Sequence, residues 1–284
     1  MNQVPVSVVI PTLGRRESLL RCVRAVAGGS ATPVQIVVVD QSGGEGLADA
    51  CVAAAAPVAV TVERRPPGGL SAARNAALAL VEQPLVAVTD DDCEPDPDWL
   101  AVAAGVLDRE PRLVAVCGPV LPLPDPTGTL VPVSSRMNRT SATFERTLEP
   151  WRIGSGGNLV CRTGVLRALG GYDERLGAGS GGGAGEDVDA LHRLLREGPI
   201  RYDARVVVRH EQKPPAARRA TRSRYGRGVG AAIGLWLRRG ELSAALVLVR
   251  WLLLRLRLLA RDAGELRVLA GTVSGLLYGL RARR

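Results

Sequence analysis

The feature that most constrains the fold of this sequence is an alternation of short apolar runs and amphipathic segments in its first half. The apolar runs are rich in Val and other small apolar residues, which predicts buried β-strands at 5–10, 35–39, 58–62, 85–89 and 113–117. Between the first two, residues 16–27 place Leu and Val side chains on one helical face. Strands that alternate with helices favour βαβ units. We therefore predict an α/β fold with a mostly parallel central sheet flanked by helices.

Polar residues stand directly behind three of these predicted strands. Pro11 and Thr12 follow the first, Asp40 closes the second, and three consecutive aspartates at 90–92 follow the fourth. The carboxyl ends of parallel strands meet at one edge of a sheet, and in open α/β sheets ligands bind outside that edge. We therefore expect these residues to line one ligand site.

The acidic run VTDDDC is the most unusual of these strand endings. Charges of the same sign repel at such short range, and a divalent cation would remove the repulsion. Asp90 and Asp92 form an Asp-x-Asp pair, whose oxygens suit Mg²⁺ or Mn²⁺ with positions left for substrate phosphates. The alternative is a solvated turn that caps a helix beginning near Trp99.

The pattern is weaker in the second half of the chain. Residues 122–150 are rich in Pro and Thr, and we expect them to wrap the surface. GSGGNLVC at 154–161 predicts a turn into a strand, and 206–208 predicts a last strand that leads to His210. GAGSGGGAG at 177–185 predicts a mobile flap in front of the next helix.

Five blocks of the sequence, in this order, resemble the family 2 glycosyltransferases: VSVVIPTLGR, VVVDQSG, GGLSAARNAAL, VTDDDCEPDPDWL and GEDVDALHRLLREG. The resemblance covers roughly residues 4–213. It implies an A-type glycosyltransferase fold, a nucleoside-diphosphate sugar as donor, and a divalent metal, Mn²⁺ or Mg²⁺, as cofactor.

By this resemblance, nucleotide-sugar binding falls to six residues: Pro11, Thr12, Asp40, Arg74, Asp90 and Asp91. The first two would lie against the base and ribose, Asp40 would accept a hydrogen bond from the base, and Asp90 would face the ribose. Arg74 would approach the diphosphate, which a cation favours. The residues alone leave open an Asx-turn at Asp40 and an exposed helical position for Arg74.

The resemblance also implies the metal ligands and the general base. Asp92 would bind the metal, and His210 would complete the metal shell, as an imidazole can. Asp187 would remove the proton of the acceptor hydroxyl, and its neighbour Glu186 would raise its proton affinity by like-charge repulsion. Asn158 is a candidate acceptor contact. The alternative for the acidic pair is a favourable interaction with a helix N-terminus.

The C-terminal segment differs from the body in charge. Residues 214–284 contain fifteen arginines and three acidic residues, whereas the whole chain has a formal net charge of +9, so the body is slightly acidic. This asymmetry favours an anionic partner. Aromatic residues make up only 3% of the chain, which argues against nucleic-acid binding by base stacking.

The sequence of the basic segment predicts amphipathic helices. Arg250, Arg257 and Arg261 fall on one helical face, and only Arg255 breaks the pattern. Arginines within an apolar run favour a helix lying on an anionic membrane over a helix crossing it. Packing against the catalytic body or a second subunit is the alternative. We predict a catalytic domain at 1–213 and a basic helical tail at 214–284.

These observations lead to one functional hypothesis with two alternatives. The chain is predicted to be an inverting, metal-dependent glycosyltransferase that moves a sugar, from UDP in the first instance, to a glycan or lipid-linked acceptor. Its N-terminus lacks the pattern of a signal peptide, so we expect it in the cytoplasm, peripheral on the inner membrane face. The alternatives are a non-catalytic nucleotide-sugar-binding scaffold and a nucleotidyltransferase.

Overall fold

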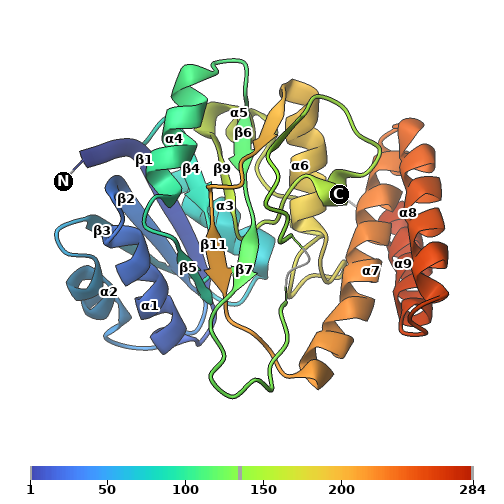
Figure 1. Cartoon of the computed structure of the whole chain (residues 1–284), viewed down its shortest axis with the longest axis horizontal. Coiled ribbons are helices and arrows are strands. Elements are labelled where there is room, and N and C mark those ends of the chain that lie inside the picture. The colour runs from blue at the N-terminus through green and yellow to red at the C-terminus, as the bar shows by residue number, and fades with distance from the viewer. Residues whose placement is uncertain (1, 134–135, 283–284) are drawn as a thin grey trace.

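A computed structural model describes residues 2–133 and 136–282 of the chain. Within these residues a central sheet of eight strands has the order β3-β2-β1-β4-β9-β6-β10-β8. Helices cover both faces of the sheet, and three further helices stand together at one side of the molecule (Figure 1). The strands are β1 (Asn2–Thr12), β2 (Ala31–Asp40), β3 (Ala59–Arg64), β4 (Leu85–Val88), β6 (Ala115–Cys117), β8 (Ala142–Phe144), β9 (Leu159–Arg162) and β10 (Ile200–Tyr202).

The pairing of the strands confirms the mostly parallel sheet. β1 is parallel to both β2 and β4, and β2 is parallel to β3. β9 runs antiparallel between β4 and β6, and β8 is antiparallel to β10. The register of β1 and β2 sets Thr12 opposite Asp40. The polar ends of these two strands therefore share one edge of the sheet.

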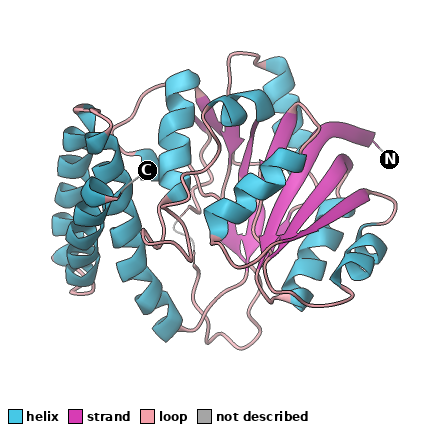
Figure 2. Cartoon of the chain, turned by 180° about the vertical axis from the view of Figure 1, so that it is seen from behind, coloured by secondary structure: helices cyan, strands magenta, loops and turns pink. Residues whose placement is uncertain are grey.

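Two apolar cores lie on the two faces of the sheet, which Figures 1 and 2 show from opposite sides. Successive β1 residues point to opposite faces, so Val8 and Ile10 belong to one core and Val9 to the other. The first core is covered by α1 (Arg16–Ala27), α2 (Leu47–Ala55) and α4 (Trp99–Arg109). The second is covered by α3 (Leu70–Leu80), α5 (Thr163–Ala168) and α6 (Glu186–Glu197).

A small second sheet brings His210 to the acidic run. Its strands are β5 (Cys93–Pro95), β11 (Val208–His210) and β7 (Val120–Pro122), and His210 pairs with Cys93. The strand expected at 206–208 thus begins two residues later than predicted. The reason is a turn, in which the Val206 N–H donates to the Asp203 carbonyl before strand pairing starts.

The basic segment forms α7 (Pro215–Arg238), α8 (Ser243–Leu259) and α9 (Glu265–Arg281). A third apolar core joins them to the body, because Trp151 and Val188 of the body pack with Trp236 and Trp251 of these helices. The predicted boundary at 213 lies just before α7. In the described part of the chain no helix is both long and apolar enough to cross a membrane.

Candidate active site

Two adjoining cavities open at the carboxyl edge of the sheet. The larger, about 470 Å³, is lined by the end of β1, the acidic run and the glycine segment after Leu176. The smaller, about 300 Å³, is lined by residues from the start of α6, the GSGG turn and α7. Asp90 and His210 line both. The acidic run therefore lies between two compartments that could hold two different ligands.

Asp91 is fixed within the protein. Its carboxylate is completely buried, accepts a hydrogen bond from Thr12 Oγ1 at 2.6 Å, and pairs with Arg15 Nη2 at 2.6 Å. Burial raises the pKa of Asp91 to about 6, although Thr12 and Arg15 act in the opposite direction. Arg15 also binds Asp92, so one guanidinium bridges two neighbouring carboxylates. This bridge offsets part of their mutual repulsion.

Asp92 and His210 have the geometry of a cation site. His210 Nδ1 lies 2.6 Å from the Glu211 carbonyl, which only accepts, so Nδ1 carries a proton. His210 Nε2 then lies 3.3 Å from Asp92 Oδ1. A neutral imidazole would point a lone pair at this carboxylate, so both groups would present ligand atoms to a shared cation.

Cys93 completes a cluster whose ligand atoms lie within 4.8 Å of one another, together with Asp92 and His210. Burial raises the pKa of the Cys93 thiol well above its usual value, so the thiol keeps its proton. A protonated thiol is a poor ligand for a hard dication, whereas carboxylate oxygen and imidazole nitrogen suit Mn²⁺. The residues present therefore fit a metal held by Asp92 and His210.

Arg74 connects Asp90 and Glu186, two carboxylates that line the cavities. Its side chain is only 1% exposed, and its guanidinium binds Asp90 Oδ1 at 2.8 Å and Glu186 Oε1 at 3.1 Å. Burial would raise the pKa of Asp90, but the charge of Arg74, with His210 and Arg15, outweighs it and holds that pKa below its usual range. The structure thus excludes the exposed helical position that the sequence left open for Arg74. It is not an exposed helix residue: its guanidinium is buried between Asp90, which is 27% exposed at the cavities, and the nearly buried Glu186.

Glu186 and Asp187 stand at the N-terminus of α6 and line the smaller cavity. Asp187 Oδ2 accepts the Gly156 N–H at 3.3 Å, and its Oδ1 accepts the Val188 N–H at 2.8 Å. Burial and the neighbouring charge of Asp187 raise the pKa of Glu186 to about 7, against the opposing effect of Arg74. Asp187 keeps access to the cavity, while Glu186 points toward Arg74.

Asp40 forms the Asx-turn that the sequence left open and keeps one carboxylate oxygen unpaired. Its Oδ1 accepts the Ser42 N–H at 2.8 Å, which is an Asx-turn. Its Oδ2 is buried and has no hydrogen-bond partner among the described residues. Gln41, the next residue, lines the larger cavity. An unpaired buried carboxylate oxygen beside a cavity suits an N–H donor from a ligand.

Asn158 corrects a sequence prediction. It was expected at the acceptor, but it is completely buried and its amide is used within the protein. Its Oδ1 accepts from Trp99 Nε1 at 2.9 Å, and its Nδ2 donates to the carbonyls of Pro119 and Val206 at 3.0 and 2.8 Å. Asn158 therefore ties the two sheets together. Both of its amide hydrogens are used, and its side chain lines neither cavity.

The glycine segment at 177–185 is held by hydrogen bonds, within itself and to the C-terminal helices, whereas its composition predicted a mobile flap. Gly177 and Ala184 are joined by a backbone hydrogen bond, and Tyr278 of α9 and Arg227 of α7 reach the segment through the carbonyls of Arg175 and Gly181. The glycines allow close approach, since a Cβ on Gly185 would lie 2.4 Å from the Gly228 carbonyl oxygen.

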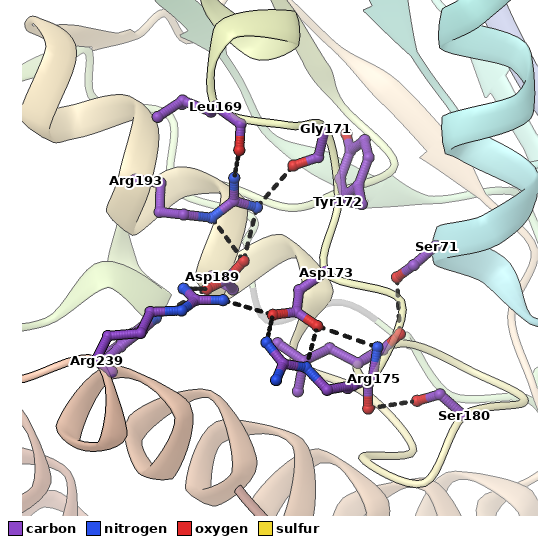
Figure 3. A network of polar contacts seen from close by, with 12 residues as sticks. Ser71, Leu169, Gly171, Tyr172, Asp173, Arg175, Ser180, Asp189, Arg193 and Arg239 are labelled. Carbon is purple, nitrogen blue, oxygen red and sulfur yellow. Dashed lines mark hydrogen bonds and ion pairs between the residues drawn. The ribbon is translucent and has the colours of Figure 1, made fainter. Parts of the chain in front are cut away.

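Figure 3 shows the polar network that supports this segment from the other side. Asp173 pairs with Arg175 at 2.7 Å and with Arg239, at the end of α7, at 2.6 Å. Asp189 of α6 is completely buried and accepts from Arg193 and from Trp236 Nε1, both at 2.8 Å. The end of α7 is therefore bound to both the loop and the helix that shape the cavities.

Sequence reasoning missed three of the residues that define this region: Arg15, Lys213 and Asp189. Arg15 stands just after the end of the first strand, as the predicted site residues stand at the ends of their strands. Its position could therefore have identified it. Lys213 is the only lysine in the sequence and lies 3.5 Å from Asp92 Oδ2. Nothing local in the sequence pointed to Asp189, because its partner Trp236 is 47 residues away along the chain.

Comparison with known proteins agrees with this architecture. Residues 7–170 match the profile of Glycosyl transferase family 2. A curated relative, the pre-mycofactocin glycosyltransferase of Mycobacterium tuberculosis, is 29% identical over 98% of this chain. The match spans only 57% of that relative's length.

Two solved structures share the fold. A mannosyltransferase of Pyrobaculum calidifontis, PcManGT, in complex with GDP-Man and Mn²⁺ has a TM-score of 0.64 at 18% identity, over 99% of this chain and 88% of that one. S. aureus TarS 1-349 in complex with UDP-GlcNAc has a TM-score of 0.57 at 16% identity, over 82% and 66%. The profile match covers more than half of the chain, and the fold agrees with it. The chain therefore belongs to glycosyl transferase family 2 and has the A-type glycosyltransferase fold.

Proposed function

We propose that this chain transfers a sugar from a nucleoside-diphosphate donor to an acceptor hydroxyl, with inversion at the anomeric carbon. The observation that carries the proposal is the division of the site by Asp90 and His210 into two cavities. One cavity holds the residues suited to a nucleotide and diphosphate. The other holds Asp187, a carboxylate placed to act on an incoming hydroxyl.

The larger cavity is the proposed donor site. Pro11 and Thr12 line it where a base and ribose would lie, and Asp40 Oδ2 would accept an N–H from the base. Asp90 would face the ribose, with Asp91 held behind it by Thr12 and Arg15. Arg15 and Lys213 also line the cavity and would attract a diphosphate. A uracil N–H fits a single carboxylate acceptor, so UDP is the proposed nucleotide.

Asp92 and His210 would hold the divalent metal, as their chemistry allows. When bound, such an ion would neutralise charge on the diphosphate as it leaves. The similar mannosyltransferase was solved with Mn²⁺, which supports manganese as the first ion to test. Arg15 and Lys213 keep the carboxylates oriented around this position.

The smaller cavity is the proposed acceptor site. Asp187 would take the proton of the attacking hydroxyl, a step often worth about 10²–10⁴-fold in rate. The Gly156 N–H would hold the carboxylate in place while this happens. Arg74 pairs with both Asp90 and Glu186, and Glu186 is the neighbour of Asp187. The charge on Asp187 would therefore respond to the charge on Asp90 through this chain of contacts. A glycan or lipid-linked precursor is the proposed acceptor class.

The test is turnover with a panel of nucleotide sugars and MnCl₂, read as released nucleoside diphosphate. We expect D187N to lose roughly 10²-fold or more of the rate while still binding donor. D49N is the matched control, because Asp49 is an exposed acid on α2, away from both cavities.

Each alternative function has its own outcome in this experiment. Donor binding by the unaltered chain with no turnover on any acceptor would indicate a scaffold. Release of pyrophosphate would indicate a nucleotidyltransferase. Full activity of D187N would remove Asp187 from the role of base.

A further inference from the structure

α8 carries a row of exposed apolar side chains on its outer face. The row follows a spacing of four and three residues, which aligns it along one side of a helix. Its members are between 45% and 84% exposed: Leu242, just before the helix, and Leu246, Val249, Leu253 and Leu256. Trp251, on the opposite side of α8, is completely buried. One face of the helix is therefore packed and the other is left to solvent.

α9 repeats this arrangement. Leu266, Val273, Leu277 and Leu280 lie on one side of the helix and are 42–57% exposed. The opposite side contains Gly275 and Gly279, which pack against α7. Both figures show α8 and α9 at the outer side of the molecule, with α7 between them and the sheet (Figures 1 and 2). Two neighbouring helices thus expose continuous apolar rows. Single exposed leucines are common on protein surfaces, but a continuous apolar patch of this kind marks an interaction site.

Arginines border both apolar rows. Arg250 and Arg257 stand beside the row on α8, Arg261 follows the end of that helix, and Arg267 and Arg281 occupy the equivalent position on α9. All five are exposed, and none forms an ion pair with another residue in the described part of the chain. Arg255, which broke the pattern in the sequence, is instead turned inward onto Trp251 and Glu265. The outer face is therefore apolar with a free positive border.

The charge of this face argues against a second copy of the chain as its partner. The three acidic residues of the segment are already paired: Glu241 with His192 and Arg196, Asp262 with Arg222, and Glu265 with Arg222 and Arg255. Two copies placed face to face would bring arginine rows together with no carboxylate between them. Such like-charge contacts oppose association.

We propose that the outer faces of α8 and α9 form a docking surface for an anionic lipid bilayer. The leucines and valines would enter the boundary between headgroups and acyl chains, and the arginines would reach phosphates beside them. This surface is independent of the proposed chemistry. It has one consequence that rests on the proposed function: α7, which lines the acceptor cavity through Tyr225, would hold that cavity near lipid.

The experiment is co-sedimentation of the purified full chain with vesicles, with intrinsic unfolding midpoints as a fold control. We expect binding to phosphatidylcholine vesicles that contain about one third phosphatidylglycerol, loss of binding in about 0.5 M NaCl, and no binding to phosphatidylcholine alone. L253E, L277E, and the triple variant R250Q/R257Q/R261Q should each lower the partition coefficient roughly tenfold or more.

Matched controls introduce the same kinds of substitution on exposed positions of the body, away from α8 and α9. V52E alters an exposed valine of α2, and R24Q/R64Q/R109Q removes three exposed arginines from the body; both should bind as the unaltered chain does. Failure of the unaltered chain to bind anionic vesicles would overturn the proposal. So would normal binding by L253E and L277E, or a dimer of the unaltered chain that L253E converts to monomers. Donor turnover is measured separately, so its loss or retention does not affect this result.

Discussion

At the scale of single residues, the acidic run is balanced by the protein itself as well as by any ion it binds. Arg15 bridges Asp91 and Asp92, and Lys213 and His210 approach Asp92 from the other side. The sequence argument took repulsion among the aspartates as the sign of a dication. The structure shows that cationic side chains relieve part of that repulsion, so the metal prediction rests on ligand chemistry at Asp92 and His210.

Glu186 gives a prediction for stability against pH. Its pKa in the folded state is about 7, above its usual value of 4.5, so the folded protein holds this proton more tightly than the unfolded chain does. The free energy of unfolding should therefore fall as pH rises from about 4.5 to about 7 and then level off. In E186Q the contribution of Glu186 to this decrease in the free energy of unfolding should be absent. Urea unfolding of both proteins at several pH values measures the difference.

The control for this prediction is E174Q, because Glu174 is an exposed acid whose one partner among the described residues is Asn75. It should keep the pH dependence of the unaltered chain. Parallel curves for E186Q and the unaltered chain would mean that Glu186 ionises normally in the folded protein. Asp91, whose pKa is raised to about 6, contributes with the same sign in both proteins.

Residues close to strand ends were predictable, and residues that depend on distant partners were not. Thr12, Asp40 and the aspartates at 90–92 could be placed from periodicity, because a strand end fixes where its last side chains lie. The sequence prediction assigned Asn158 the wrong surroundings, and it left the burial of Arg74 open. Their burial depends on Trp99 and Glu186, which no local pattern connects to them.

At the scale of elements, the contact between α7 and α9 depends on glycine. A Cβ on Gly275 would lie 1.9 Å from the Arg227 carbonyl oxygen. The two helix backbones therefore approach as closely as only glycine allows. The sequence showed the amphipathic character of this segment but not which face would pack, since glycine contributes no apolar signal.

We expect G275A to destabilise the protein by about 1–3 kcal/mol, because the added methyl group must push α9 away from α7. Gly164 of α5 is the matched control, as a Cβ there would meet nothing within 4 Å. G164A should be neutral or slightly stabilising. Urea midpoints for the two variants give the comparison, and equal midpoints would show that the helices have room to separate.

At the scale of the whole molecule, the body and the C-terminal helices share the third core. Trp151, Leu176 and Val188 are covered by α7 and its neighbours, and the buried Asp189 takes a hydrogen bond from Trp236. The sequence predicted the fold class and the order of strands and helices in the first half. Packing of the tail against the body was only one of its alternatives, and the third core confirms it. The sequence could not choose it, because the division at 213 followed a change in charge, and charged residues mark the surface.

A chain shortened to residues 1–213 should therefore not fold as an independent unit. It would expose the apolar side chains of the third core and leave Asp189 with only part of its hydrogen bonding. We expect strong binding of a hydrophobic dye and a broad thermal transition, measured beside the full chain in the same buffer. A sharp transition near that of the full chain would show that the two predicted domains are separable.

The position of α7 has a consequence for how such proteins can diversify. Its N-terminal half lines the smaller cavity, the proposed acceptor site, through Thr221 and Tyr225, while its later turns pack against α9. A change of acceptor that widened this cavity would shift that packing, and a change of the outer helices would reshape the cavity. The proposed acceptor choice and the proposed membrane attachment are therefore coupled through one helix, and hybrid proteins made by exchanging C-terminal segments should inherit both or neither.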